Sequence, residues 1–191
     1  MAEPVGDTTG VARRVSSPAA ISGAPILGRF AASVGGISEK YGYRGDMATR
    51  EELESFLDEY QSTLSAYDAE RTAALWGIPG TIVSDDFVGA LHSREEMAQG
   101  LAQAHPIYQT LGLARVAHTV VDYAELTGSL LRARVRWHFY DSDDALLTDS
   151  DYEYLLRRDD DGLRTYVAVA IDEAEKLARV ATDRGVRLPG M

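Results

Sequence analysis

The stretch that decides the fold is SLLRARVRWHFY, residues 129–140, in which apolar and polar side chains alternate from Leu131 onward. Side chains along a β-strand point to the two faces of a sheet in turn, so this alternation predicts a strand with one buried face. The buried side chains are predicted to be Leu131, Ala133, Val135, Trp137 and Phe139, and the opposite ones Arg132, Arg134, Arg136, His138 and Tyr140. This division is typical of an antiparallel sheet that is covered on one side.

Further segments with a period of two accompany this strand, so the sequence predicts four long strands. They span roughly 113–125, 128–141, 145–158 and 163–171. Turns are expected at Asp141–Asp144 and Asp159–Gly162, and the Asp-Gly pair that closes the second turn is a strong hairpin signal. Long strands joined by hairpins predict an antiparallel meander.

Opposite charges meet across this meander if its first turn centres on residues 143–144. The expected cross-strand pairs are Arg136 with Asp151, Arg134 with Glu153, and His138 with Asp149. Each pair contributes only ~0.2–1 kcal/mol, so the charges do not define the fold by themselves. They predict either a sheet surface that faces solvent or a second copy in a homodimer, or else a catalytic arginine–carboxylate cluster.

Helices are predicted before these strands, where apolar residues recur every three or four positions. The first runs from about Thr49 to Tyr67 and opens with a capping box of Thr49 and Glu52. Its apolar stripe consists of Leu53, Leu57, Tyr60, Leu64 and Tyr67. Asp68 is expected to cap a short second helix, Ala69–Trp76, which Gly77-Ile78-Pro79-Gly80 ends.

Two short strands and two more helices complete the predicted elements. The strands are Thr81–Ser84 and Phe87–Leu91. Ser93 and Glu96 form a second capping box, for a helix that reaches about Gln109. Asp172 is expected to open a closing helix that ends near Gly185.

The composition is that of one folded domain with a flexible leader. The chain has 191 residues, 45% of them apolar, which is enough for a real core. We expect a flexible extension over 1–46, an α+β domain over 47–186 and a short tail over 187–191. Because there is no cysteine, disulfides, cysteine zinc sites and thiol nucleophiles are excluded.

The charge of the chain limits its partners. The formal net charge is −11, and residues 1–46 are close to neutral, so the predicted domain carries the acidity. An acidic domain repels phosphate backbones, so we expect no nucleic acid partner. No apolar run reaches the ~18–20 residues that cross a bilayer, so no membrane partner is expected either. We expect a cytoplasmic location, with an export signal at Arg13-Arg14 as the alternative.

This order of elements resembles the NTF2-like fold, a cone of N-terminal helices packed on a strongly curved antiparallel sheet. It is most similar to the SnoaL-like and ketosteroid-isomerase-like branch of that superfamily. Tyr60 is followed eight residues later by Asp68, as in the isomerases, and VSDDFVG at 83–89 resembles the strand that carries their base. The resemblance implies that Asp86 is the proton-shuttling base and that Tyr60 donates a hydrogen bond to the substrate. Tyr154 falls where those enzymes have a protonated aspartate as second donor.

The same three residues suit acid/base chemistry on their own. Tyr60 lies on the apolar stripe and Tyr154 on an inner strand face, so both hydroxyls are expected inside. Asp86 lies next to Phe87 and Val88, and partial desolvation would strengthen it as a base. A carboxylate that faces two phenols suits proton abstraction next to a carbonyl, because the phenols stabilise the enolate oxygen.

Other residues are candidates for the surroundings of this site. His118 lies in a strand with Val116 and Val120 and is a candidate acid or base of the pocket. The wall around a small hydrophobic substrate is predicted to consist of Tyr67, Trp76, Trp137 and Tyr152. No cofactor is expected, and the four histidines have no ligand-like spacing, so no metal is expected.

Two functions lead, and a role as an accessory subunit of a larger complex, which the resemblance to this fold also implies, is a third option. The first is a cofactor-independent isomerase, cyclase, dehydratase or epoxide hydrolase that acts on a carbonyl-bearing metabolite. The second is a non-catalytic module that binds a small ligand or dimerises. In that case Tyr60 is a core tyrosine, Asp86 an ordinary turn residue and His118 a hydrogen-bonded interior residue.

Overall fold

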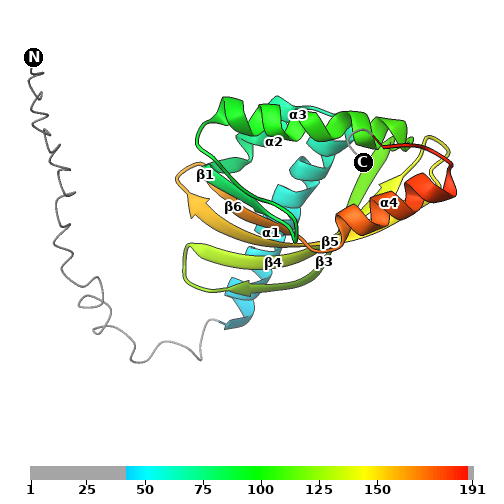
Figure 1. Cartoon of the computed structure of the whole chain (residues 1–191). Helices are drawn as coiled ribbons and strands as arrows, with labels where there is room; N and C mark the ends of the chain where they lie inside the picture. Colours follow the sequence, from blue (N-terminus) through cyan, green and yellow to red (C-terminus); the bar gives the residue numbers. More distant parts are fainter. Residues whose placement is uncertain (1–41, 189–191) are drawn as a thin grey trace, which may run out of the picture. The chain divides into compact units, whose positions relative to one another are not determined.

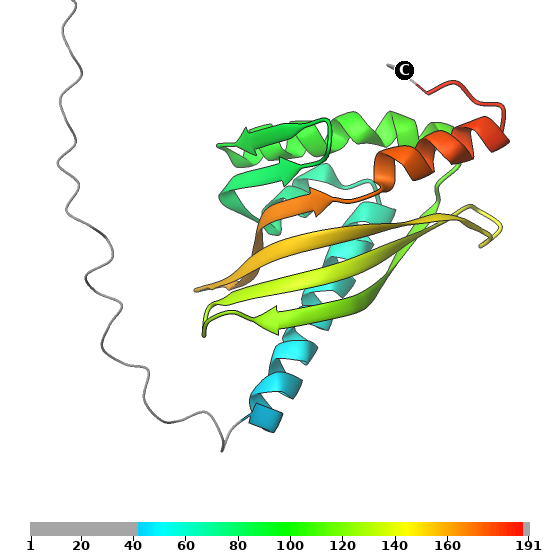
Figure 2. The same cartoon turned by 60° about the horizontal axis from the view of Figure 1, so that its bottom comes forward.

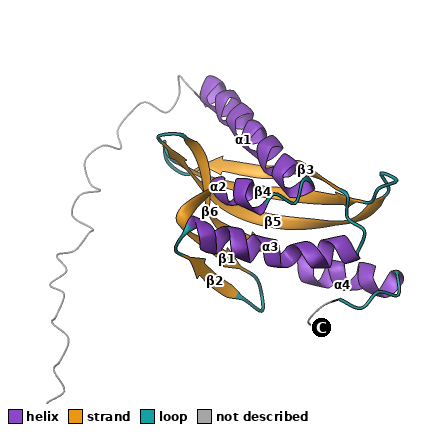
Figure 3. Cartoon of the chain, turned by 90° about the horizontal axis from the view of Figure 1, so that it is seen from above, coloured by secondary structure: helices purple, strands orange, loops and turns teal. Residues whose placement is uncertain are grey.

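Helices cover one face of a curved six-stranded sheet in the computed structural model, which describes residues 42–188 (Figure 1). The elements are α1 (Gly42–Ser65), α2 (Ala69–Ala74), β1 (Trp76–Val83), β2 (Val88–Leu91), α3 (Arg94–Thr110), β3 (Arg115–Glu125), β4 (Leu130–Tyr140), β5 (Leu146–Asp159), β6 (Gly162–Ala170) and α4 (Glu173–Asp183). Seen from above, α1 and α3 lie over the sheet and α4 lies beside the end of α3 (Figure 3). The predicted α+β architecture is confirmed.

The four long strands pair as predicted. β3, β4, β5 and β6 form an antiparallel meander, whose strands lie side by side in Figure 2, within a sheet of order β2-β1-β6-β5-β4-β3. The β4–β5 register confirms the pairs Arg136 with Asp151, Arg134 with Glu153, and His138 with Asp149. The inner face of β4 is also confirmed, because Leu131, Ala133, Val135, Trp137 and Phe139 are all buried.

β1 differs from the prediction in its length and in one of its pairings. It begins at Trp76 and runs through Gly77-Ile78-Pro79-Gly80, and it pairs with β6 in parallel, so the sheet is not purely antiparallel. The register shifts between Trp76 and Thr81, so the strand passes the Gly-Pro run as an irregularity. Gly77 is needed there, because a Cβ atom on it would lie 2.2 Å from the Tyr166 ring.

The start of α1 was predicted wrongly. The helix begins at Gly42, so Thr49 lies within it and does not cap it. Thr49 Oγ1 instead donates to Glu125 Oε2 at 2.9 Å and accepts from Arg158 Nη2 at 3.0 Å. Arg158 Nε also donates to Glu52 Oε2 at 2.7 Å. The two residues of the predicted capping box therefore tie α1 to the ends of β3 and β5.

The other three predicted helix starts hold, and two of their caps hold with them. Asp68 accepts a hydrogen bond from the Arg71 backbone N–H at 3.0 Å, and Ser93 accepts one from the Glu96 N–H at 3.1 Å. Asp172 occupies the N-cap position of α4, but its side chain makes no capping bond. Its carboxylate accepts from the Asp151 N–H at 2.9 Å instead, which fixes the start of α4 against β5.

The segment after α4 packs onto the fold as far as Leu188. Leu188 is buried in a cluster with Leu111, Leu177, Val180 and Ala181, so the folded part includes it. The rest of the predicted tail, 189–191, and residues 1–41 of the predicted extension lie outside the described residues. None of the helices between residues 42 and 188 has the length and apolar character that crossing a membrane requires.

Candidate active site

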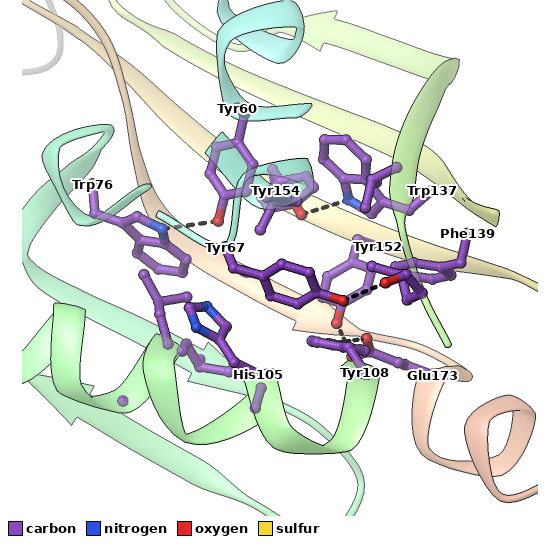
Figure 4. Close-up of a pocket in the computed structure, with 18 residues that line it drawn as sticks. Tyr60, Tyr67, Trp76, His105, Tyr108, Trp137, Phe139, Tyr152, Tyr154 and Glu173 are labelled. Carbon is purple, nitrogen blue, oxygen red and sulfur yellow. Dashed lines mark hydrogen bonds between the residues drawn. The ribbon is translucent and has the colours of Figure 1, made fainter. Parts of the chain in front are cut away.

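An aromatic cavity of about 220 Å³ lies between the sheet and the helices (Figure 4). It is lined mainly by rings, with a few polar atoms among them. The side chains that matter below are Tyr60, Tyr67, Trp76, His105, Tyr108, Trp137, Phe139, Tyr152, Tyr154 and Glu173. They come from α1 and the turn after it, from α3 and α4 and from three strands, so the tertiary fold assembles the cavity.

Two tyrosine–tryptophan pairs form one side of the cavity. Trp76 Nε1 donates to the Tyr60 hydroxyl at 2.9 Å, and Trp137 Nε1 donates to the Tyr154 hydroxyl at 2.8 Å. Both tyrosines are buried, and burial raises the pKa of each hydroxyl, which keeps it protonated. No described residue accepts a hydrogen bond from either hydroxyl, so both protons are left for a ligand.

A carboxylate held by two phenols forms the other side. Glu173 is the first residue of α4 and is half-buried, and the hydroxyls of Tyr108 and Tyr152 each donate to one of its oxygens. Burial raises the pKa of Glu173, while the two phenol hydrogen bonds oppose this shift. A carboxylate with a raised pKa is a stronger base than an ordinary one, and it keeps lone pairs free for a ligand.

His105 and Tyr67 lie at the edge of the same cavity. Their rings meet edge-on, with centroids 5.2 Å apart. The Tyr67 hydroxyl donates to the Leu113 carbonyl at 2.7 Å, so it is engaged in the fold. Within residues 42–188, neither ring nitrogen of His105 has a hydrogen-bond partner, and burial lowers the pKa of the imidazole. His105 therefore presents a neutral ring to the cavity.

The structure does not bring Asp86 to this cavity. Asp86 lies in the exposed turn between β1 and β2, beside Phe87, whose side chain is 57% exposed. It lines a separate outer cleft together with Asp85 and the first turn of α4. The desolvation by Phe87 and Val88 that we expected is absent, because both side chains point into solvent.

His118 is also placed outside the cavity, between α1 and β3. Its Nδ1 lies 2.9 Å from Gln61 Oε1, and its Nε2 lies 3.0 Å from Glu54 Oε2. Its ring packs edge-on against Trp137, with centroids 5.9 Å apart. His118 thus supports a cavity wall from behind. The remaining predicted wall residues, Tyr67, Trp76, Trp137 and Tyr152, do line the cavity together with Tyr60 and Tyr154.

The sequence analysis did not identify three polar residues of the cavity, which are His105, Tyr108 and Glu173. A signal existed for two of them, because Leu101, His105 and Tyr108 recur at helical spacing and share one face of α3. No sequence signal marked Glu173, because the direction of its side chain depends on the hydrogen bond that the Asp172 carboxylate accepts from the Asp151 N–H. Nowhere in the described part of the chain are three His, Asp or Glu side chains grouped so that they could hold a metal.

A cone of helices on a curved sheet around an internal ligand-sized cavity defines a class of small α+β proteins. The chain belongs to the NTF2-like family: the model of a family described as NTF2-like protein (DUF6841) matches residues 50–173. The match runs from within α1 to the first residue of α4 and includes every residue that lines the cavity. A comparison with curated proteins finds no match.

Solved structures show the same fold at low sequence identity. A domain of unknown function from Nostoc punctiforme, with a cystatin-like fold, has a TM-score of 0.54 and 16% identity over 73% of this chain and 88% of that one. An NTF2-like protein from Novosphingobium aromaticivorans has a TM-score of 0.52 and 19% identity over 71% and 91%. A structure from Catenulispora acidiphila in complex with S-DNPA has a TM-score of 0.53 and 17% identity over 69% and 98%.

Proposed function

We propose that this protein is a cofactor-independent acid/base enzyme that moves a proton next to the carbonyl group of a small hydrophobic molecule. One observation carries the proposal: the Glu173 carboxylate faces the same aromatic cavity as the Tyr60 and Tyr154 hydroxyls. Glu173 takes the role of base that the sequence suggested for Asp86. In the resemblance to ketosteroid-isomerase-like proteins, Tyr60 takes the place of their substrate-binding tyrosine, and this supports the same kind of chemistry.

The proposed step uses only these side chains. Glu173 removes a proton from the carbon next to the carbonyl; the electron pair of that C–H bond forms a C=C bond to the carbonyl carbon, and the π pair of the C=O bond moves to the oxygen. Tyr60 and Tyr154 donate hydrogen bonds to the enolate oxygen that results. Glu173, now a carboxylic acid, returns the proton to the same carbon or to a conjugated one, which gives exchange or isomerisation.

The size and walls of the cavity limit the substrate. A volume of about 220 Å³ is below the ~300–1,000 Å³ of most small-molecule sites, so a ligand of one or two rings fits. The walls are aromatic, and stacking on Tyr152 and Tyr154 favours a flat molecule. The complex of the Catenulispora acidiphila relative with S-DNPA supports a ligand site in this fold.

A second candidate is a non-catalytic ligand-binding module. The observation in its favour is that Tyr108 and Tyr152 already satisfy the Glu173 carboxylate, as they would in a purely structural arrangement. Both functions predict ligand binding. Only the enzyme predicts proton transfer to and from carbon.

Solvent deuterium exchange separates the two functions. α-Tetralone and cyclohexenone are incubated with the protein in D2O, and NMR follows the loss of the protons next to the carbonyl. We expect exchange above the buffer rate with the wild type and with Asp86→Asn, and a loss of at least ~100-fold with Glu173→Gln. Glu51→Gln, an exposed change on α1, serves as the control.

Binding is measured on the same samples through tryptophan fluorescence. The chain has two tryptophans, Trp76 and Trp137, and both line the cavity, so the whole signal reports on the site. Quenching without any exchange would support the binding module. Exchange that is lost in Asp86→Asn and kept in Glu173→Gln would reject the proposed base.

We also propose that the protein forms a homodimer through the outer face of its sheet. Arg132, Arg134 and Arg136 lie on this face among the carboxylates of Asp122, Asp151 and Glu153. Glu153 lies 3.7 Å from Arg132 Nη1 and 4.0 Å from Arg134 Nη1, so positive and negative side chains alternate across this face, as a self-complementary interface between two copies requires. Light scattering tests the association, as set out in the Discussion.

A further inference from the structure

An outer cleft of about 440 Å³ adjoins the cavity. It lies between the end of β1, the end of β6, the C-terminal half of α3 and the first turns of α4. Five residues line both hollows: Ile82, Ala104, Tyr108, Tyr152 and Glu173. The carboxylate proposed as the base therefore stands at the junction of the two spaces.

The cleft combines an apolar floor with an acidic rim. Ile107, Ala170, Leu177 and Leu188 contribute carbon surface, while Asp85, Asp86, Asp172 and Glu175 contribute carboxylates. Among the described residues, no lysine or arginine lines either the cleft or the cavity. The nearest cation along the chain, Lys176, has its ammonium group bound by Asp149 and Asp172.

We propose that the outer cleft is the second half of the ligand site and takes an extension of the substrate that ends in an ammonium group. The ring of the same molecule lies in the cavity, so this inference rests on the proposed function of Glu173 and its neighbours. The cavity alone is small for a small-molecule site, whereas cavity and cleft together fall within the usual range. Asp85 and Asp86 then select the charge of the substrate and take no part in proton transfer.

The occupant follows from the wall residues that the two spaces share and from charge. An extension of the ligand that passes Glu173 contacts the apolar side chains of the cleft floor directly. Asp172 is paired with Lys176, and Glu175 with Arg179. A carboxylate or phosphate at the end of the extension would therefore meet mainly the charges of Asp85 and Asp86, with no basic residue on the wall. An ammonium group meets complementary charge there, while its carbon chain covers the floor.

The test compares ligands that differ only in their extension. Four α-tetralones, one bare and three with a butyl chain ending in ammonium, hydroxyl or carboxylate, are titrated by calorimetry into the full-length protein. At low salt we expect the ammonium compound to bind about tenfold more tightly than the alcohol, and the carboxylate about tenfold more weakly. Both differences should shrink at high salt, because screening weakens contacts between exposed charges.

Variants locate the effect in the cleft. The triple change Asp85→Asn, Asp86→Asn and Glu175→Gln should bring the three chain-bearing ligands to within about twofold of one another. It should leave bare tetralone unaffected. The matched control, Glu51→Gln, Asp58→Asn and Glu59→Gln, removes the same charge from exposed positions of α1 and should keep the selectivity.

The outcomes separate this inference from the proposed function. Exchange of bare tetralone without any charge selectivity overturns the inference and leaves the proposed base intact. Charge selectivity without exchange rejects the enzyme but keeps the two-part site. Equal binding of all four ligands would mean that the cleft holds something else, such as a segment of another protein, and overturns the inference as well.

Discussion

The indole nitrogen of Trp137 lies 2.8 Å from the hydroxyl oxygen of Tyr154 and donates to it across neighbouring strands of the sheet. Both side chains are buried, so either group is costly without the other. This bond fixes the direction of one of the two hydroxyl protons that face the cavity. Its strength can be measured apart from any catalytic role.

A double-mutant cycle gives that strength. Trp137→Phe should lower the free energy of unfolding by ~1–3 kcal/mol, because the Tyr154 oxygen loses its donor and the smaller ring leaves space. Tyr154→Phe should cost a similar amount, since the indole N–H is then unpaired. In urea denaturation, we expect the double variant to be ~1 kcal/mol more stable than the sum of the single effects predicts. Additive effects would show that the two side chains do not interact.

Asp151 should make the stability of the fold depend on acid pH. Hydrogen bonds from Arg136 and then Arg134 lower the pKa of Asp151 from 3.8 to about 2, although its burial opposes the shift. A lowered carboxylate pKa stabilises the fold above pH 3.8, and this contribution is lost as pH falls toward 2. The full shift corresponds to about 2 kcal/mol, and screening by solvent around the half-exposed arginines reduces the expectation to about 1 kcal/mol.

Asp151→Asn provides the comparison. At pH 7 the variant should be less stable than the wild type, and the gap should close between pH 4 and pH 2 in denaturation experiments. The exposed change Asp143→Asn should leave the curve unchanged. A gap that stays constant down to pH 2 would contradict the assigned ion pairs.

Because the pKa of Glu173 is raised, the rate of the proposed reaction should depend on pH. Only the carboxylate form can accept a proton, so exchange should fall as pH drops through the pKa, which lies above its usual 4.5. The Tyr108 hydrogen bond lowers this pKa, so Tyr108→Phe should move the falling limb of the kcat/KM profile to higher pH. Tyr67→Phe is the control, because its hydroxyl bonds to Leu113 and should leave the limb in place. A shift to lower pH in Tyr108→Phe would refute the assignment.

Arg158 should hold α1 against the sheet at its third turn, around Thr49 and Glu52. Its guanidinium contacts Thr49, Glu52, Glu125 and the Gly128 carbonyl. Arg158→Met should lower the free energy of unfolding by ~1 kcal/mol and speed amide hydrogen exchange over residues 49–57. Arg50→Met breaks an exposed pair with Glu54 on the same helix and should change neither quantity. Unchanged exchange in Arg158→Met would mean that packing alone secures the helix.

The homodimer is tested on the outer face of the sheet. We expect light scattering at micromolar concentration to give the mass of two chains, and Arg132→Glu with Arg134→Glu to give that of one. Like charges would then meet Asp151 and Glu153 within each chain, so circular dichroism must show that the variant is still folded. If the wild type is a monomer, the homodimer proposal is rejected, and the proposed function of the cavity is unaffected.

The periodicity of the sequence was enough to place the strands, and it failed where the backbone is irregular. Alternation along β4 fixed both the buried face and the pairing of Arg136 with Asp151, because a slip of one residue would expose Trp137. Trp76 was assigned to a helix, since a Gly-Ile-Pro-Gly run normally ends an element. β1 continues past that run because it pairs with β6 on both sides of it, at Trp76 and from Thr81 onward, and this long-range pairing has no local sequence signal.

The aromatic part of the site was predictable and its carboxylate was not. Tyr60 and Tyr154 follow from helical and strand periodicity, which put them inside. Asp86 was chosen from a short motif, yet its turn lies in solvent beside an exposed Phe87. Glu173 enters the cavity because Asp172 bonds back to β5 and turns the next residue inward, a long-range contact that the sequence does not encode locally.

Glu173 reaches the cavity only through α4, which packs by Leu177 and Val180 in a cluster that Leu188 of the following segment completes. During synthesis on the ribosome, Tyr60, Tyr108 and Tyr154 leave the exit tunnel before Glu173 does. The aromatic walls can therefore collapse on one another while the proposed base is still being translated. A nascent chain at that stage holds every ring of the site but no carboxylate, and docking of α4 is the event that turns the enclosed space into a reactive one.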